Sequence, residues 1–170
     1  ALAFFLHMFA FYFVLSWTPK LLVSAGVSAQ QGITGGVLLN LGGIVGGSLF
    51  GWLASRWALS RLTAGALLLA MVSMLGFAAF STQLGVAFPL AFVIGAALFA
   101  AMAGLYAAAP VVFAAEVRTT GLGWAIGIGR VGAILSPLTV GVLVDGGWQP
   151  SSLYVLCAAP LLLAAWACLG

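Results

Sequence analysis

The sequence predicts an all-α transmembrane protein, a bundle of six helices, and three observations support this fold class. First, 65% of its 170 residues are hydrophobic and 4% are charged, with a mean hydropathy of +1.29, whereas a soluble domain has about a quarter of its residues charged. Second, the apolar residues form six runs that each approach the ~20 residues needed to cross a ~30 Å hydrocarbon core. Third, these runs are too long and too rich in Ala, Leu and Gly for barrel strands, which alternate in segments of ~10 residues.

Polar residues, glycines and prolines set the limits of the six spans. We expect them at 1–24, 31–54, 62–80, 86–110, 119–143 and 151–169. The connections are short, so consecutive spans should be antiparallel, and we expect two three-helix repeats of inverted orientation, a plan that recurs in transporters. The chain lacks an initiator Met and both of its ends fall within apolar runs. We therefore expect it to be a segment of a longer protein.

The basic residues of the loops predict the orientation of the bundle in the membrane. Arg56, Arg61 and Arg118 fall on one side of a six-span path, and Lys20 falls on the other side with Asp145. Cytoplasmic loops carry an excess of Lys and Arg. We therefore expect both ends of the chain in the cytoplasm, with the protein spanning the inner membrane of the cell.

The chain offers no pattern for catalysis, for a cofactor or for nucleic acid. It has one histidine, two carboxylates in different loops and no cluster of metal ligands. Residues 127–132, GIGRVG, match the dinucleotide-binding spacing, but they lie inside an apolar helix instead of following a strand. The net charge of +3 is too small and too scattered for a nucleic-acid surface. We therefore expect no enzyme, no cofactor and no metal.

Glycines in the second and fifth spans recur at the spacing that lets helix backbones approach closely. In part of each span, a small residue recurs at every fourth position. The set comprises Gly43, Gly47 and Gly51, beside Gly42 and Gly46, in the second span, and Gly123 and Gly127, followed by Gly129 and Ala133, in the fifth. We interpret these stripes as helix-packing faces.

Arg130 is the most informative charge, because it lies deep within the fifth span. It follows Arg118 by twelve positions, which places it ~18 Å further along a helix. An arginine near the bilayer centre costs ~2.5–3.5 kcal/mol on insertion scales, so it should face a protein interior or a wet cavity. Its planar fork suits a carboxylate. The partner is either a substrate anion or a carboxylate on a segment outside this chain, since no span of this chain contains an acidic residue.

The first and second spans supply the other candidate site residues. Phe5, Phe9 and Tyr12 share one helical face and could line a pocket for a flat ring. Asn40 lies in mid-span, where it could donate a hydrogen bond to a ligand or to a neighbouring helix. His7 is the one side chain here with an ordinary pKa near neutrality, so it is a candidate for proton coupling; a buried, hydrogen-bonded structural histidine is the alternative.

Three stretches resemble the second half of a major facilitator superfamily transporter. Residues 51–61, GWLASRWALSR, are similar to the short basic loop after its eighth helix; Gly51, Leu53 and Arg56 match, and Ser55 replaces the usual aspartate. Residues 110–137 and the WTPKLL of residues 17–22 resemble the aromatic acid/proton symporter family within that superfamily. The matching positions of the longer motif are Glu116, Arg118, Gly121, Gly123, Gly129, Arg130, Gly132 and Pro137.

The resemblance implies a secondary transporter that imports benzoate-like or hydroxybenzoate-like acids together with protons, by alternating access. The chain would then hold helices seven to twelve of a twelve-helix fold, and the N-terminal six-helix half would be absent from it. Arg130 would bind the substrate carboxylate, with Phe5, Phe9 and Tyr12 on its ring. Arg56, Glu116 and Arg118 would form a cytoplasmic charge cluster that steadies one state.

Two alternatives remain open at this point. One is a member of the same superfamily that carries another organic anion, a sugar or a drug. Sugar carriers line their path with Gln and Asn, and this chain has only Asn40 in mid-span, so an anion is favoured. The other is a structural membrane protein without a substrate, in which Arg130 pairs with a neighbouring acid.

Overall fold

The computed structural model describes residues 1–24, 26–80 and 83–169, and it contains six helices. They are α1 (Leu2–Ser24), α2 (Ala29–Ala54), α3 (Leu59–Phe80), α4 (Leu84–Val112), α5 (Arg118–Asp145) and α6 (Pro150–Leu169). The described residues form no strand. All six helices are long and apolar enough to cross a membrane, so the all-α prediction is confirmed and the chain has the architecture of a multi-pass membrane protein.

A capping box and two glycines with positive φ form the short connections before α2 and α6. At the start of α2, the Ser28 hydroxyl accepts a hydrogen bond from the backbone N–H of Gln31 at 3.2 Å, and the Gln31 side chain accepts one from the backbone N–H of Ser28 at 3.1 Å. This capping box satisfies two N–H groups that the helix itself leaves without partners. Gly26 (φ 99°) and Gly147 (φ 84°) adopt left-handed backbone conformations in the turns before α2 and α6, which glycine adopts without steric cost.

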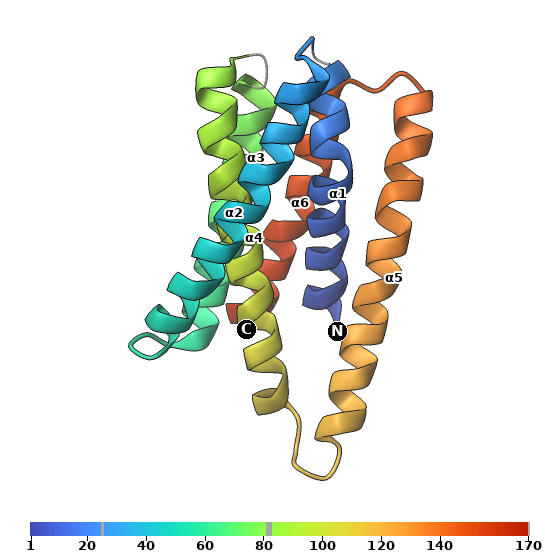
Figure 1. Cartoon of the computed structure of the whole chain (residues 1–170). Helices are drawn as coiled ribbons and strands as arrows, with labels where there is room; N and C mark the ends of the chain where they lie inside the picture. Colours follow the sequence, from blue (N-terminus) through green and yellow to red (C-terminus); the bar gives the residue numbers. More distant parts are fainter. Residues whose placement is uncertain (25, 81–82, 170) are drawn as a thin grey trace.

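The six helices form two inverted three-helix repeats (Figure 1). α2 packs mainly on α4 and α5 mainly on α1, while α3 packs on both α4 and α6, and α6 also packs on α1. Exchanging α1, α2 and α3 for α4, α5 and α6 leaves these main contacts in place, although α1 packs on α2 more closely than α4 packs on α5. α1 and α4 run in opposite directions, so the repeats are inverted, as the sequence led us to expect.

The two chain ends lie at the same end of the bundle, together with the α2–α3 and α4–α5 connections (Figure 1). These connections hold Arg56 and Glu116, and Arg61 and Arg118 lie in the first turns of the helices that follow them. Lys20 and Asp145 lie at the opposite end. Three arginines thus lie at one end of the bundle and one lysine at the other; the cytoplasmic placement of the arginine-bearing end stays a prediction.

The core joins the repeats through α1, α3 and α6. The Tyr154 side chain is fully buried, and its ring packs on Phe13 at 5.1 Å and on Phe77 at 4.8 Å between ring centroids. Its hydroxyl shares a hydrogen bond of 2.5 Å with the buried Thr18 hydroxyl of α1. A tyrosine enters an apolar core at low cost only where its O–H has such a partner.

Glycines bring α2 and α4 into direct backbone contact. A Cβ added at Gly42 would meet the carbonyl oxygen of Phe92, one at Gly46 would meet that of Ala96, and one at Gly95 of α4 would meet that of Leu39. No side chain fits between the helices at these three positions. The crossing therefore depends on glycine at each of them.

The structure corrects part of the packing prediction. Gly43 does pack, with the Phe99 ring 2.5 Å from its added Cβ, but Gly47, Gly51, Gly123 and Gly127 have no atom within 4 Å of that position. Each of these four shares its helix with a neighbouring glycine stripe that faces the partner helix instead. Of the glycines named in the two stripes, those in contact with another helix are Gly42, Gly43 and Gly46 in α2 and Gly129 in α5; Gly132 of α5 also makes such a contact. A packing role for the other four stays a prediction about contacts outside this chain.

Candidate anion-binding site

One face of α1 is left partly open by the bundle. Phe5, Phe9 and Tyr12 are half-buried, whereas Phe4, Met8 and Phe13 are buried. The open face continues for one more turn to Ser16, which is exposed. Helical spacing places these three rings on one face, and their role in lining a substrate pocket stays a prediction. Ser16 follows Tyr12 by four positions, and the same spacing could have identified it.

Small residues set the distance between this face and α5. A Cβ at Gly132 would lie 2.6 Å from the backbone oxygen of Phe5, and one at Gly129 would lie 3.3 Å from side-chain atoms of Phe4 and Met8. α5 therefore packs directly on the α1 backbone along these two glycines. Arg130 is the next residue after Gly129, so it projects from the edge of the contact and not into it.

Arg130 turns back from that edge toward α1. Its Nη1 donates a hydrogen bond to the Tyr12 hydroxyl at 3.4 Å, although the two residues are 118 positions apart in sequence. This length is at the outer limit of a hydrogen bond, and the guanidinium has five N–H donors in total. The arginine is exposed, and the described residues supply no other hydrogen-bond partner for it. Most of its donors are thus free for a ligand.

The acidic residues of the chain lie too far away to neutralise Arg130. Asp145 ends the same helix fifteen positions later, ~22 Å along its axis, and Glu116 precedes the helix. No ion pair forms between described residues of the chain. The arrangement can therefore accept an anion next to Tyr12, and the rings of Phe5 and Phe9, on the same face of α1 as Tyr12, suit an anion with an apolar ring.

Asn40 and His7 differ in burial and in hydrogen bonding. Asn40 is exposed on α2, and its amide Nδ2 donates to the carbonyl of Gly36 in its own helix at 2.9 Å; its Oδ1 is left as an acceptor. His7 is fully buried, its ring 5.7 Å from that of Phe11, and neither of its nitrogens has a partner among the described residues. The hydrogen bond expected for a purely structural histidine is therefore not found there.

Curated proteins similar to this chain are transporters of aromatic acids. The benzoate transport protein of Acinetobacter baylyi is 36% identical over 141 residues, which are 83% of this chain and 30% of that protein. The gallate transporter of Pseudomonas putida is 31% identical over 99% of this chain and 38% of its own length. The gentisate transporter of Corynebacterium glutamicum is 28% identical over 98% of this chain and 37% of its own length. No family model matches the chain.

This chain is a homologue of bacterial aromatic acid transporters. The resemblance predicted from its motifs is thereby confirmed. Three of these relatives match almost all of the residues of this chain, and the chain spans between 37% and 41% of their length. The relatives are named as transporters and not as enzymes, which supports a non-enzymatic role.

The three charged residues that we expected to form a cytoplasmic cluster are exposed, but the structure shows no ion pair among them in the described residues. Arg56, Glu116 and Arg118 are all exposed, and no ion pair links them within the described part of the chain. Arg56 instead lies over the Trp52 ring, 4.8 Å from its centroid. The α2–α3 and α4–α5 connections that carry Arg56 and Glu116 lie apart (Figure 1). A gating role for these three residues stays a prediction.

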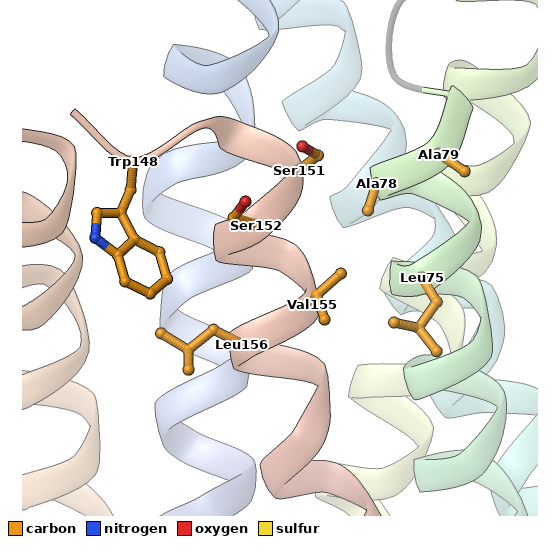
Figure 2. Close-up of a pocket in the computed structure, with 8 residues that line it drawn as sticks. All are labelled: Leu75, Ala78, Ala79, Trp148, Ser151, Ser152, Val155 and Leu156. Atoms are coloured by element: carbon orange, nitrogen blue, oxygen red, sulfur yellow. The ribbon is translucent and has the colours of Figure 1, made fainter.

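A separate groove of about 550 Å³ lies between α3 and α6 (Figure 2). Leu75 and Val155 form its walls, Trp148 lies at its end, and Ser151 and Ser152 supply its hydroxyls. None of the lining residues is charged. The groove therefore lacks the cation that a carboxylate substrate needs, and the open face around Arg130 is the better candidate site.

Proposed function

We propose that this chain is the C-terminal six-helix half of an aromatic acid transporter of the major facilitator superfamily. The complete protein would have twelve helices in the inner membrane, with both ends of this chain in the cytoplasm. It would import benzoate-like or hydroxybenzoate-like acids together with protons by alternating access. The observation that carries the proposal is Arg130, an arginine within a membrane-spanning helix that meets Tyr12 and no carboxylate among the described residues.

Substrate binding would begin with the guanidinium of Arg130. Two of its parallel N–H groups can hold a carboxylate in bidentate fashion, a geometry that lysine does not offer. The Tyr12 hydroxyl occupies a third donor and fixes the orientation of the fork. The substrate ring would then lie against Phe5 and Phe9, and the amide of Asn40 would be a further hydrogen-bonding group on the adjacent helix.

The exposed sides of α2 and α5 support the presence of a second half. Gly47 and Gly51 on α2 and Gly123 and Gly127 on α5 leave room for side chains of other helices. The relatives named above are also more than twice as long as their match to this chain. The missing half would close the site around Arg130 and would supply the carboxylates that a proton-coupled carrier needs.

Proton coupling within this half would involve His7. Its buried imidazole has no hydrogen-bond partner among the described residues, and a buried polar group without a partner is costly unless a function or a water molecule accounts for it. His7→Gln keeps the size and polarity of the side chain but cannot carry a charge. The expected result is uptake that equilibrates the substrate but no longer concentrates it against a gradient.

The basic loop residues would act on the transport cycle and not on binding. Arg118 is the first residue of α5 and is exposed at the end of the bundle that we place in the cytoplasm. Arg118→Ala should slow uptake while leaving the substrate dissociation constant unchanged. An uptake rate equal to that of the wild type would remove this assignment.

The experiment that tests the proposed function is uptake of labelled 4-hydroxybenzoate by cells that express the complete transporter. Wild type and Arg130→Gln are compared at matched surface expression, with and without a proton uncoupler. The proposal predicts uptake that the uncoupler abolishes and that Arg130→Gln reduces at least tenfold, roughly the effect of losing one charge-assisted hydrogen-bonded pair. Equal uptake by both proteins would make Arg130 a structural residue.

The alternatives give different results in the same assay. A carrier of another organic anion would show no uptake of 4-hydroxybenzoate, yet Arg130→Gln would still abolish uptake of its own substrate. In a structural protein, Arg130→Gln would lower the folded yield and no aromatic acid would be transported. The matched-expression control separates these two outcomes.

A further inference from the structure

A second hollow, remote from Arg130, lies between α2 and α3 and has α4 as its floor. Its volume is about 490 Å³, within the range of small-molecule sites, ~300–1,000 Å³. α2 and α3 contact each other very little, although both pack closely on α4. Small residues then keep the space open: Gly65 and Ala66 of α3, and Ala96, Ala97 and Ala100 of α4.

The walls of this hollow are almost entirely apolar. Leu49, Phe50 and Leu53 of α2 face Leu62 and Leu69 of α3 across it. A Cβ placed at Gly65 would meet no atom within 4 Å. The hollow therefore offers an apolar slot and no hydrogen-bonding group along most of its length.

A cation lies at one end of the slot. Arg61, in the first turn of α3, is part of the lining together with Trp57 of the α2–α3 connection, and both are exposed. Arg56 belongs to the same connection, where it lies over Trp52. Tryptophan is enriched at the boundary between hydrocarbon and headgroups, and arginine is enriched in the cytoplasmic loops next to it.

No acid in this chain is placed to pair with these arginines. The chain has two carboxylates: Asp145 is at the opposite end of the bundle and Glu116 is in the separate α4–α5 connection (Figure 1). The described residues form no ion pair with Arg61 or Arg56. The site thus combines an apolar slot with unpaired positive charge at its membrane-boundary end.

We propose that this hollow binds an anionic phospholipid, with an acyl chain in the slot and the phosphate at Arg61. The slot excludes a polar solute, and an arginine at its end selects an anionic head over a zwitterionic one. A helix of another polypeptide would need an acidic side chain at the level of Arg61, whereas the bilayer supplies the phosphate at that depth. Basic pockets between transmembrane helices on the cytoplasmic side bind such headgroups in other membrane proteins; the cytoplasmic placement of this end rests on the proposed function.

The test is native mass spectrometry of the complete protein after reconstitution with equal amounts of phosphatidylglycerol and phosphatidylcholine. The wild type should retain phosphatidylglycerol in preference to phosphatidylcholine. Arg61→Gln should lower the retained phosphatidylglycerol roughly fivefold, the contribution of one basic residue at an anionic surface, and leave phosphatidylcholine unchanged. Gly65→Phe should fill the slot and lower the retention of both lipids.

Matched variants outside the hollow provide the controls. Gly85→Phe adds the same ring at another glycine with open space around it, and Lys20→Gln removes an exposed cation at the opposite end of the bundle; both should retain lipid as the wild type does. Arg61→Gln changes an exposed side chain, so the charge test stands even if Gly65→Phe fails to fold. Equal retention of the two lipids by the wild type, or unchanged retention in Arg61→Gln, would overturn the proposal. Displacement of the lipid by millimolar inorganic phosphate would indicate a free-anion site and would overturn it too.

Discussion

The α2–α4 crossing and the α1–α5 crossing occupy equivalent positions in the two inverted repeats, yet they are built differently. At the first, Gly42, Gly46 and Gly95 put backbone against backbone, so that no Cβ fits. At the second, only Gly132 faces backbone, the Phe5 oxygen 2.6 Å from its added Cβ, whereas Gly129 meets the side chains of Phe4 and Met8 at 3.3 Å. α5 is also the least buried of the six described helices.

The looser crossing is the one that carries the candidate site. Because α5 is covered on one side only, Arg130 can emerge beside the contact and reach Tyr12 at 3.4 Å. The tighter crossing has no comparable polar side chain between its helices. The repeated plan therefore provides two similar crossings. One has three glycines against backbone, and the other has one, beside which Arg130 is exposed and could bind an anion.

The largest expected effect breaks the tight crossing. Gly46→Ala adds a single Cβ that would collide with the backbone oxygen of Ala96, so the two helices must separate. Overpacking of a core costs typically 1–3 kcal/mol, and backbone contact leaves little room for relief. We expect the free energy of unfolding in detergent to fall by about 3 kcal/mol, measured by denaturant titration followed by circular dichroism.

Gly47→Ala is the matched control for this change. It adds the same atom one residue later, where no atom lies within 4 Å, and alanine is intrinsically the better helix residue by about 1 kcal/mol. Its stability should equal or exceed that of the wild type. Equal losses in the two variants would mean that the crossing does not depend on glycine at position 46.

A smaller effect is expected in the core that both crossings share. Thr18→Val keeps the shape of the side chain but leaves the fully buried Tyr154 hydroxyl without its partner. An unsatisfied buried hydroxyl costs about 1–3 kcal/mol, and we expect a loss near 2 kcal/mol in the same titration. Thr139→Val, on the exposed side of α5, should lose nothing. Adding Tyr154→Phe to Thr18→Val should recover part of the stability; a double variant that is no better would contradict the hydrogen-bond explanation.

The smallest effect concerns the looser crossing. Tyr12→Phe removes the acceptor that orients Arg130 but keeps the aromatic ring on the α1 face. The lost bond is long, so we expect the substrate dissociation constant to rise about threefold, the lower end of what one hydrogen bond contributes. Isothermal titration with benzoate measures the change. A loss as large as that of Arg130→Gln would mean that Tyr12, and not the arginine, is the primary ligand.

The fold was predictable because composition and span length are strong signals, and the predicted spans agree with α1 to α6 to within a few residues at most ends. The aromatic face of α1 was predictable because helical periodicity depends only on the chain itself. Which of the glycines form the helix contacts was not predictable from the sequence. On α2, Gly42, Gly43 and Gly46 are buried and Gly51 is exposed, and only the position of α4 decides which of these neighbouring glycines it covers.

Contacts between distant segments could not be predicted from the sequence either. The Arg130–Tyr12 hydrogen bond depends on the depth at which α5 crosses α1, which Gly129 and Gly132 determine jointly with Phe5. The hollow beside Arg61 exists because α2 and α3 diverge above small residues of α4. No local sequence pattern predicts that α2 and α3 diverge.

The most direct test of the central claim compares two ligands that share a phenyl ring, one with a carboxylate and the other with a neutral hydroxymethyl group. Dissociation constants of benzoate and benzyl alcohol are measured by isothermal titration with the complete protein, for the wild type and for Arg130→Gln. If Arg130 binds the carboxylate, the variant should bind benzoate at least tenfold more weakly, as expected for a lost charge-assisted pair, and benzyl alcohol as the wild type does. Equal weakening of both ligands, or of neither, would contradict the assignment of Arg130 as the anion site.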